Sequence, residues 1–82
     1  MRLRKQPVKY LSKVDGNTYK KLHKQLNHLE QGTARVEKLK DSEYYKLSIE
    51  QYRIIMLYDT ANNIIDVVEI NSRTNISYRR YM

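Results

Sequence analysis

The sequence predicts an α+β fold in a single domain, residues 1–82, and three observations support this prediction. In the first third, apolar residues recur every three to four positions, the period of an amphipathic helix. After Gly32 the period changes to two, which is typical of strands with one buried face. No repeat or linker interrupts the chain. Helices followed by a meander indicate a helical hairpin packed on one face of a three- to four-stranded antiparallel sheet.

Two helices are expected in the first third. Pro7 suits the first turn of a helix, and apolar residues follow at helical spacing: Val8, Leu11 and Val14. The stretch from Asp15 to Asn17 ends this helix, and Asn17 or Thr18 is expected to cap the next one. The second helix has one apolar stripe, made of Tyr19, Leu22, Leu26 and Leu29. Gly32 is expected to end it.

The strands are expected in residues 35–39, 44–49, 52–59 and 64–70. Residues 1–6 could add a further short strand or form a loose arm. The stretch 64–70 is apolar and β-branched, as in a central strand. Only Glu50 and Gln51 separate two of these strands, which is the length of a tight hairpin turn.

That turn length fixes the pairing of the hairpin. The expected pairs are Ile49 with Tyr52, Ser48 with Arg53, Leu47 with Ile54, and Lys46 with Ile55. Cross-strand partners share a face, and a shift by one residue would exchange the two faces. The predicted core side consists of Tyr45, Leu47, Ile49, Tyr52, Ile54, Met56 and Tyr58. The predicted solvent side has Lys46, Ser48 and Arg53, with Arg73 and Tyr78 within reach and Glu69 opposite Arg53.

Sixteen basic and nine acidic residues give a net charge of +7. Residues 1–24 carry +7, residues 25–70 carry −3, and residues 71–82 carry +3. This distribution indicates either a polyanionic partner or a chain kept soluble by charge. Cysteine is absent, so no disulfide is expected. No apolar run is long enough for a signal peptide or a membrane span, which predicts a cytoplasmic protein without a membrane partner.

The usual catalytic motifs are missing. The sequence has no Gly-rich phosphate loop, nucleophile elbow or paired-histidine metal motif, so neither a metal nor a cofactor is expected. Cations and phenols can still cleave an RNA phosphodiester with its own 2′-hydroxyl as nucleophile, because guanidinium groups stabilise the developing negative charge. Lysine or tyrosine acts as base there only within a cluster of cations, which favours its deprotonated form. An ordinary solvated sheet face explains the same cations.

Three stretches of the chain resemble a known family: VEKLKDSEYYKL, YYKLSIEQYRIIMLYD and DVVEINSRTNISYRRY. Together with the lysine-rich hairpin before them, they are similar to the RelE/ParE superfamily of bacterial toxins, from residue 7 to residue 81. The strongest features are the Tyr-Lys-Leu strand, the Tyr-Arg return of the hairpin, and the arginine after the last strand followed by Tyr-Arg. Helices followed by an antiparallel sheet is also the layout of that superfamily.

The resemblance to the RelE branch implies a toxin of a type II toxin–antitoxin system. Such a toxin is a metal-independent endoribonuclease that cleaves mRNA in the ribosomal A site, inhibits translation, and is silenced by a cognate antitoxin. By this resemblance Arg53 and Arg73 hold the phosphate, Lys46 acts as base or electrostatic stabiliser, and Tyr78 stacks on RNA or assists proton transfer. The expected contacts with RNA and the ribosome are Lys9, Lys13, Lys20, Lys21, Lys24, Arg79, Arg80 and Tyr81.

The sequence departs from the family pattern in places. Ser48 stands where some ribosome-dependent members have a second lysine, and Tyr81 competes with Tyr78 for the role of the C-terminal tyrosine. The ParE branch shares the fold but inhibits DNA gyrase without a nuclease site. The alternatives are therefore a gyrase inhibitor, or a non-catalytic module of the same fold that binds nucleic acid or protein.

Overall fold

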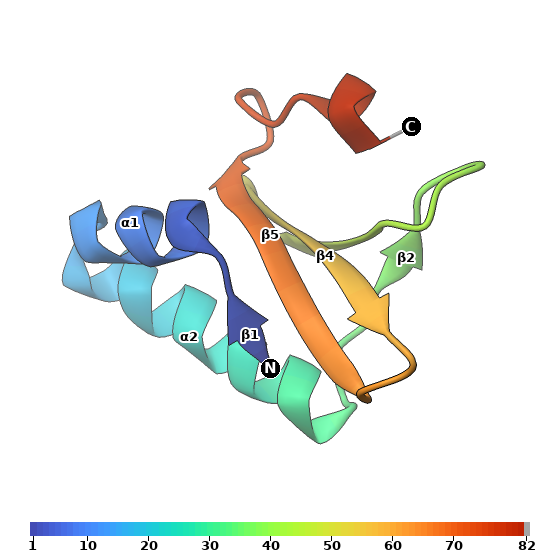
Figure 1. The fold of residues 1–82 in the computed structure, drawn as a ribbon. Coiled ribbons are helices and arrows are strands. Elements are labelled where there is room, and N and C mark those ends of the chain that lie inside the picture. The colour runs from blue at the N-terminus through green and yellow to red at the C-terminus, as the bar shows by residue number, and fades with distance from the viewer. Residues whose placement is uncertain (82) are drawn as a thin grey trace.

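The computed structural model describes residues 1–81, so residue 82 of the expected domain lies outside it. The elements are β1 (Arg2–Leu3), α1 (Lys5–Lys13), α2 (Gly16–Gln31), β2 (Glu37–Lys38), β3 (Tyr45–Ile49), β4 (Tyr52–Asp59), β5 (Ile64–Ser72) and the 3₁₀ helix η1 (Tyr78–Tyr81) (Figure 1). The strands form one sheet in the order β1-β5-β4-β3-β2. No helix within residues 1–81 is both long enough and apolar enough to cross a membrane.

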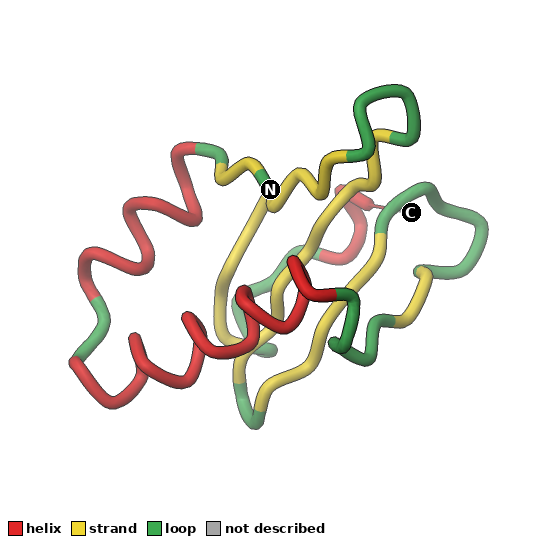
Figure 2. The backbone as a smooth tube through the Cα atoms, turned by 90° about the horizontal axis from the view of Figure 1, so that it is seen from below, coloured by secondary structure: helices red, strands yellow, loops and turns green. Residues whose placement is uncertain are grey.

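The helical hairpin is confirmed, with small changes at its ends (Figure 2). α1 begins two residues before Pro7, which still lies in the first turn. The cap of α2 is Asp15, not Asn17 or Thr18: its carboxylate accepts a hydrogen bond of 2.7 Å from the backbone N–H of Thr18. Gly32 ends α2 as expected, with a φ of 73° that glycine adopts without steric cost.

The register predicted for the hairpin of β3 and β4 is confirmed for every pair from Ile49 with Tyr52 to Lys46 with Ile55. The predicted sheet of three to four antiparallel strands is wrong, because the sheet has five strands and is mixed. Both outer strands have only two residues. β1 pairs in parallel with β5, since the chain crosses from β1 through the helices before it enters the antiparallel meander.

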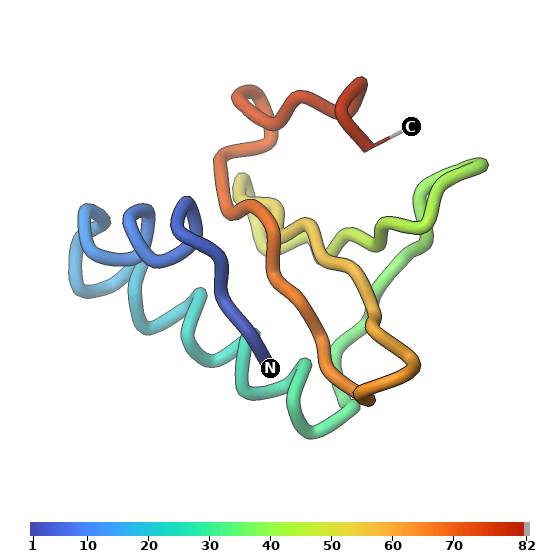
Figure 3. Tube along the Cα trace, in the orientation of Figure 1, coloured from blue at the N-terminus to red at the C-terminus, as the bar shows by residue number. Residues whose placement is uncertain are grey.

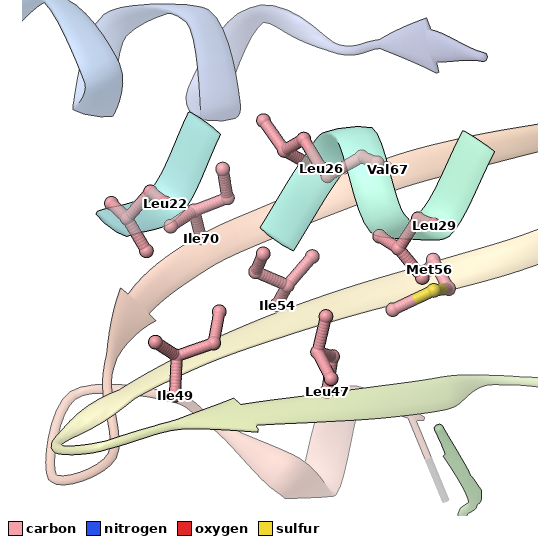
Figure 4. Close-up of a cluster of buried hydrophobic side chains, with 9 residues drawn as sticks. All are labelled: Leu22, Leu26, Leu29, Leu47, Ile49, Ile54, Met56, Val67 and Ile70. Atoms are coloured by element: carbon pink, nitrogen blue, oxygen red, sulfur yellow. The ribbon is translucent and has the colours of Figure 1, made fainter. Parts of the chain in front are cut away.

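The helices cover one face of the sheet. The buried residues between them come from α2, β3, β4 and β5: Leu22, Leu26, Leu29, Leu47, Ile49, Ile54, Met56, Val67 and Ile70 (Figure 4). Side chains of Tyr45 and Tyr52 pack against this cluster, as the pattern predicts. Tyr58 does not: it is 47% exposed, because it lies at the rim of a pocket beside Gly32, where α2 has ended.

The opposite face of the sheet is not open to solvent over its whole width, contrary to the sequence-based expectation. After β5 the chain turns back over this face, and Ile76 and Tyr81 bury their side chains there against Leu39 and Ile55. The C-terminal residues thus lie across the sheet from the helices, next to the loop that joins β2 to β3 (Figure 3). The fold therefore has three layers: helices, sheet and C-terminal segment.

Candidate functional site

The sheet face opposite the helices is arranged in rows that cross the strands. Lys46 on β3 pairs with Ile55 on β4, and Ile55 pairs with Glu69 on β5. In the neighbouring row Ser48 and Asn71 flank Arg53. Partners in a row share a face, so the lysine, the arginine and the glutamate all belong to the face that the C-terminal segment covers in part. We call this surface the candidate face.

Lys46 lies between an aromatic ring and a carboxylate. Its Nζ atom is 5.7 Å from the centroid of the Tyr78 ring, within the range of a cation–π contact. It also lies 3.8 Å from Oε2 of Glu37, whose side chain is 72% exposed. An ion pair that is this open to water contributes little free energy, so an incoming phosphate can compete for the ammonium group.

Arg53 is held by its own hairpin turn. Its Nη1 atom donates hydrogen bonds to the backbone oxygens of Glu50, at 2.9 Å, and Tyr52, at 2.7 Å. These bonds fix the guanidinium plane beside the turn and use one of its three nitrogens. Glu69 does not lie opposite Arg53, as the sequence suggested, but opposite Ile55, and Arg53 pairs with Asn71. The loop between β4 and β5 and a register shift between Ile55 and Met56 together set this pairing.

Arg73 lies at the same end of the sheet. Its backbone N–H donates a hydrogen bond of 2.6 Å to the oxygen of Gln51, which extends the pairing of β5 with β4 into the hairpin turn. The side chain is exposed, and no ion pair within residues 1–81 includes it. The backbone therefore brings Arg53 and Arg73 to neighbouring positions around one turn.

The 3₁₀ helix η1 brings the last candidate residues to this face. Arg79 and Arg80 are exposed, whereas the Tyr81 side chain is buried. The Tyr81 hydroxyl donates a hydrogen bond to the carboxylate of Glu69, and the Tyr81 backbone oxygen accepts one from the hydroxyl of Ser42. Burial raises the pKa of Tyr81 well above its usual value, and the hydrogen bond to Glu69 raises it further.

The lysines expected to contact ribosomal RNA belong to the other layer. Lys9 and Lys13 lie on α1, and three more lie on α2: Lys20, Lys21 and Lys24. All are exposed. Lys21 is engaged, because its Nζ atom lies 3.0 Å from Oε2 of Glu50, and hydrogen bonding to that carboxylate raises the Lys21 pKa. This pair connects the helix layer to the hairpin turn beside Arg53.

Two residues that contact the candidate residues, Ser42 and Glu37, were not identified from the sequence, and neither was the bond of Glu69 to Tyr81. Glu69, Ser42 and Glu37 all contact candidate residues through their side chains. The sequence places Glu69 on this face, and its position in a largely apolar strand is a signal that its carboxylate needs a partner when it is buried. No comparable signal marks Ser42, which lies in the loop between β2 and β3, or Glu37, which lies on the two-residue strand β2.

Chemically, the candidate face offers cationic and phenolic groups. No group of three or more potential metal ligands among His, Cys, Asp and Glu occurs in the described part of the chain. Guanidinium groups beside a turn can bind a phosphate through two hydrogen bonds each. The exposed portion of Tyr78 next to Lys46 offers a surface for stacking a base.

The sequence matches no protein-family model and no curated protein. Among solved structures, the chain is similar to one chain in the crystal structure of the RelB-RelE antitoxin-toxin complex from Methanococcus jannaschii. The TM-score is 0.72 with 18% sequence identity, and the match covers 90% of this chain and 92% of that one. The protein therefore shares the fold of a chain from an antitoxin–toxin complex.

Proposed function

We propose that the protein is the toxin of a toxin–antitoxin system and cleaves mRNA without a metal ion, on the ribosome and in the cytoplasm. The observation that carries this proposal is the placement of Lys46, Tyr78 and Arg53 on one sheet face, with the backbone of Arg73 bonded to the hairpin turn beside Arg53. The shared fold with a chain of an antitoxin–toxin complex supports the system-level part of the proposal.

In this mechanism the RNA supplies its own nucleophile. The 2′-oxygen forms a bond to the adjacent phosphorus while the bond to the 5′-oxygen breaks, which yields a 2′,3′-cyclic phosphate and a 5′-hydroxyl. Arg53 and Arg73 bind the phosphate and stabilise the extra negative charge of the transition state. Lys46 serves as base or electrostatic stabiliser, and Tyr78 stacks on a base or takes part in proton transfer to the leaving oxygen.

The remaining cations bind RNA around this centre. Arg79 and Arg80 are exposed beside Tyr78, so we assign them to the phosphates of the message. Lys9, Lys13, Lys20 and Lys24 are assigned to ribosomal RNA, through sequence-independent contacts that weaken with salt. We assign no stacking role to Tyr81, because its ring is buried and its hydroxyl is bound to Glu69. A cognate antitoxin would have to neutralise this cationic surface.

One observation favours a second candidate, a binding protein without nuclease activity, such as a gyrase inhibitor of the same fold. The guanidinium of Arg53 is bonded to its own hairpin turn, and the ammonium of Lys46 faces Glu37. If these contacts persist in the working protein, the two side chains shape a surface for another macromolecule and do not act on a phosphate.

Primer extension on a defined message in a cell-free translation reaction separates the two candidates. Reactions with and without ribosomes would compare the wild type with Arg53→Ala and Arg73→Ala. Lys38→Ala, which removes an exposed cation on β2, is the matched control. Cuts in the translated frame that require ribosomes, persist in the control and disappear in both arginine variants are expected. An intact message with the wild-type protein contradicts the nuclease proposal and leads to gyrase supercoiling assays.

A further inference from the structure

The segment formed by residues 76–81 carries three residues to which the proposed function assigns a role at the RNA, Tyr78, Arg79 and Arg80, but few backbone bonds hold it. The turn before it is closed by bonds of 3.0 and 3.1 Å from the N–H groups of Asn75 and Ile76 to the oxygen of Ser72. Beyond the single turn of η1, the described segment adds a 3.2 Å bond from the N–H of Arg80 to the oxygen of Ser77. These bonds are local, so the position of the segment on the sheet must depend on side-chain anchors.

Two buried side chains anchor the segment, one at each end. Ile76 is 7% exposed and Tyr81 is 9% exposed, and both pack on Ile55 in the middle of the sheet. Tyr81 is also tied by direction-specific contacts. Its hydroxyl is bound to Glu69 on β5, and its backbone oxygen is bound to Ser42 in the loop between β2 and β3. Tyr78 lies between the two anchors.

The hydrogen bond between Tyr81 and Glu69 is not needed for the packing of the Tyr81 ring against the sheet. Glu69 is 8% exposed, so both its carboxylate and the Tyr81 hydroxyl have given up contact with water. Replacing two buried hydrogen-bonding partners by apolar groups of similar shape is often neutral or stabilising. What a hydrogen bond adds to packing is direction. The Glu69 carboxylate fixes where the Tyr81 ring ends and thereby where the preceding turn, with Tyr78, lies over Lys46.

We propose that Glu69 and Tyr81 are positioning residues: their hydrogen bond holds residues 76–81 on the sheet so that Tyr78 lies against Lys46. Neither residue touches the RNA, and both act through Tyr78. This inference rests on the proposed function, because it assigns a role within the same site. It adds that the site depends on an acidic residue outside the cationic cluster.

The test is a double-mutant cycle of RNA cleavage between Tyr81→Phe and Tyr78→Ala. Tyr81→Phe keeps the buried ring and removes only the hydroxyl. It should lower kcat roughly 10-fold, since a hydrogen bond to a charged group contributes enough free energy for such a change. In the Tyr78→Ala background the same substitution should have almost no further effect. Tyr58→Phe, which removes an exposed hydroxyl bonded to Asn63, is the matched control and should cleave like the wild type.

A second measurement, the rate of trypsin cleavage, tests in the absence of RNA how firmly residues 76–81 are held on the sheet. Trypsin cuts after arginine, and cutting of a held segment requires it to open. In Tyr81→Phe and in Glu69→Gln, cleavage after Arg79 and Arg80 should be faster, by roughly 10-fold in the phenylalanine variant. Cleavage after Arg35, measured in the same samples by mass spectrometry, should keep its wild-type rate. Glu69→Gln retains an oxygen that accepts a hydrogen bond, so its increase should be the smaller one.

The outcomes separate this inference from the proposed function. If the wild type does not cleave RNA, the proposed function fails. If the wild type cleaves RNA but Tyr81→Phe is unaffected in rate and in trypsin sensitivity, the positioning role is wrong while the function stands. Equal effects of Tyr81→Phe in the wild-type and Tyr78→Ala backgrounds also contradict it, because a residue that acts through Tyr78 loses its effect when Tyr78 is gone.

Discussion

The buried carboxylate of Asp66 accepts two hydrogen bonds from the guanidinium of Arg4, through Nε at 3.2 Å and Nη2 at 2.8 Å. Arg2 on β1 lies 3.5 Å from the same oxygen. Asp66 lies on β5, so this cluster connects the start of the chain to the central part of the sheet. Because β1 has only two residues, side chains supply much of this connection.

Asp66→Asn should therefore weaken the fold. The amide retains an oxygen for Arg4 but loses the negative charge between two arginines, and hydrogen bonds to charged groups are the stronger ones. We expect the free energy of unfolding to fall by about 1–3 kcal/mol, measured by urea denaturation. Glu43→Gln, at an exposed position, is the control and should leave the urea midpoint unchanged.

The same pair predicts a pH dependence. Hydrogen bonding to Arg4 holds the pKa of Asp66 below its usual value. The unfolded chain then binds more protons than the folded chain at acidic pH, so stability falls as pH falls. The contribution of Asp66 is complete above the ordinary aspartate pKa of about 3.9 and is lost as pH drops through the lower pKa of the folded state.

Urea midpoints of the wild type and Asp66→Asn between pH 7 and pH 2 test this dependence. The gap between the two proteins should be constant at neutral pH and narrow below roughly pH 4. Two other aspartates also have lowered pKa values: Asp15 through the backbone N–H of Thr18, and Asp59 through the Asn62 side chain. Both are present in the two proteins, so they do not contribute to the difference between the urea midpoints. A gap that stays constant to pH 2 would show that Asp66 has an ordinary pKa.

Two substitutions of Tyr78 distinguish the roles left open for it. If the ring stacks on RNA, Tyr78→Phe should bind single-stranded RNA as tightly as the wild type. Tyr78→Ala should lose about 1–3 kcal/mol of binding free energy, the usual contribution of one base–aromatic stack. Fluorescence anisotropy with a labelled RNA gives both values. Tyr19→Ala, at an exposed ring stacked on His23 in the helix layer, is the control.

The sequence predicts the hairpin of β3 and β4 fully, because a two-residue turn leaves one register that buries Leu47 and Ile54 together. The position of Glu69 could not be predicted in this way. The register shift between Ile55 and Met56 leaves Val68 without a partner on β4, so that Glu69 pairs with Ile55. A bulge places two residues of one strand opposite one residue of the next. The alternation of apolar and polar residues in the sequence does not show where this happens.

The C-terminal layer also lacks a sequence signal. Ile76 and Tyr81 bury their side chains from a short turn and a single 3₁₀ turn, where neither helical nor strand spacing applies. The residues between Ile76 and Tyr81 are polar or cationic, which is typical of a solvated tail. The sequence therefore predicts the pairing of β3 with β4 better than it predicts the segment that covers the sheet.

The helical core gives a stability prediction. Leu26 is 3% exposed, lies between α2 and the sheet, and belongs to the larger apolar cluster. Leu26→Ala should lower the free energy of unfolding by about 2–5 kcal/mol, because transfer energy is lost and a cavity remains. Val8→Ala, at a position that is 53% exposed, is the control. Thermal melts that place Leu26→Ala level with Val8→Ala would contradict the assignment of Leu26 to the core.

The lysines of the helix layer are expected to differ in their contribution to binding ribosomal RNA. Lys20 and Lys24 are exposed, whereas Lys21 is bound to Glu50. Each lysine that contacts a phosphate releases counterions. Its removal therefore makes the plot of log K for binding against log salt less steep, by roughly 0.7–0.9 in the slope. Lys20→Gln and Lys24→Gln should each show this change in ribosome binding measured across salt concentrations. Lys21→Gln should change the slope less. Glu50→Gln, which frees Lys21, should make the salt dependence steeper. If all four variants keep the wild-type slope, the helix layer does not bind ribosomal RNA.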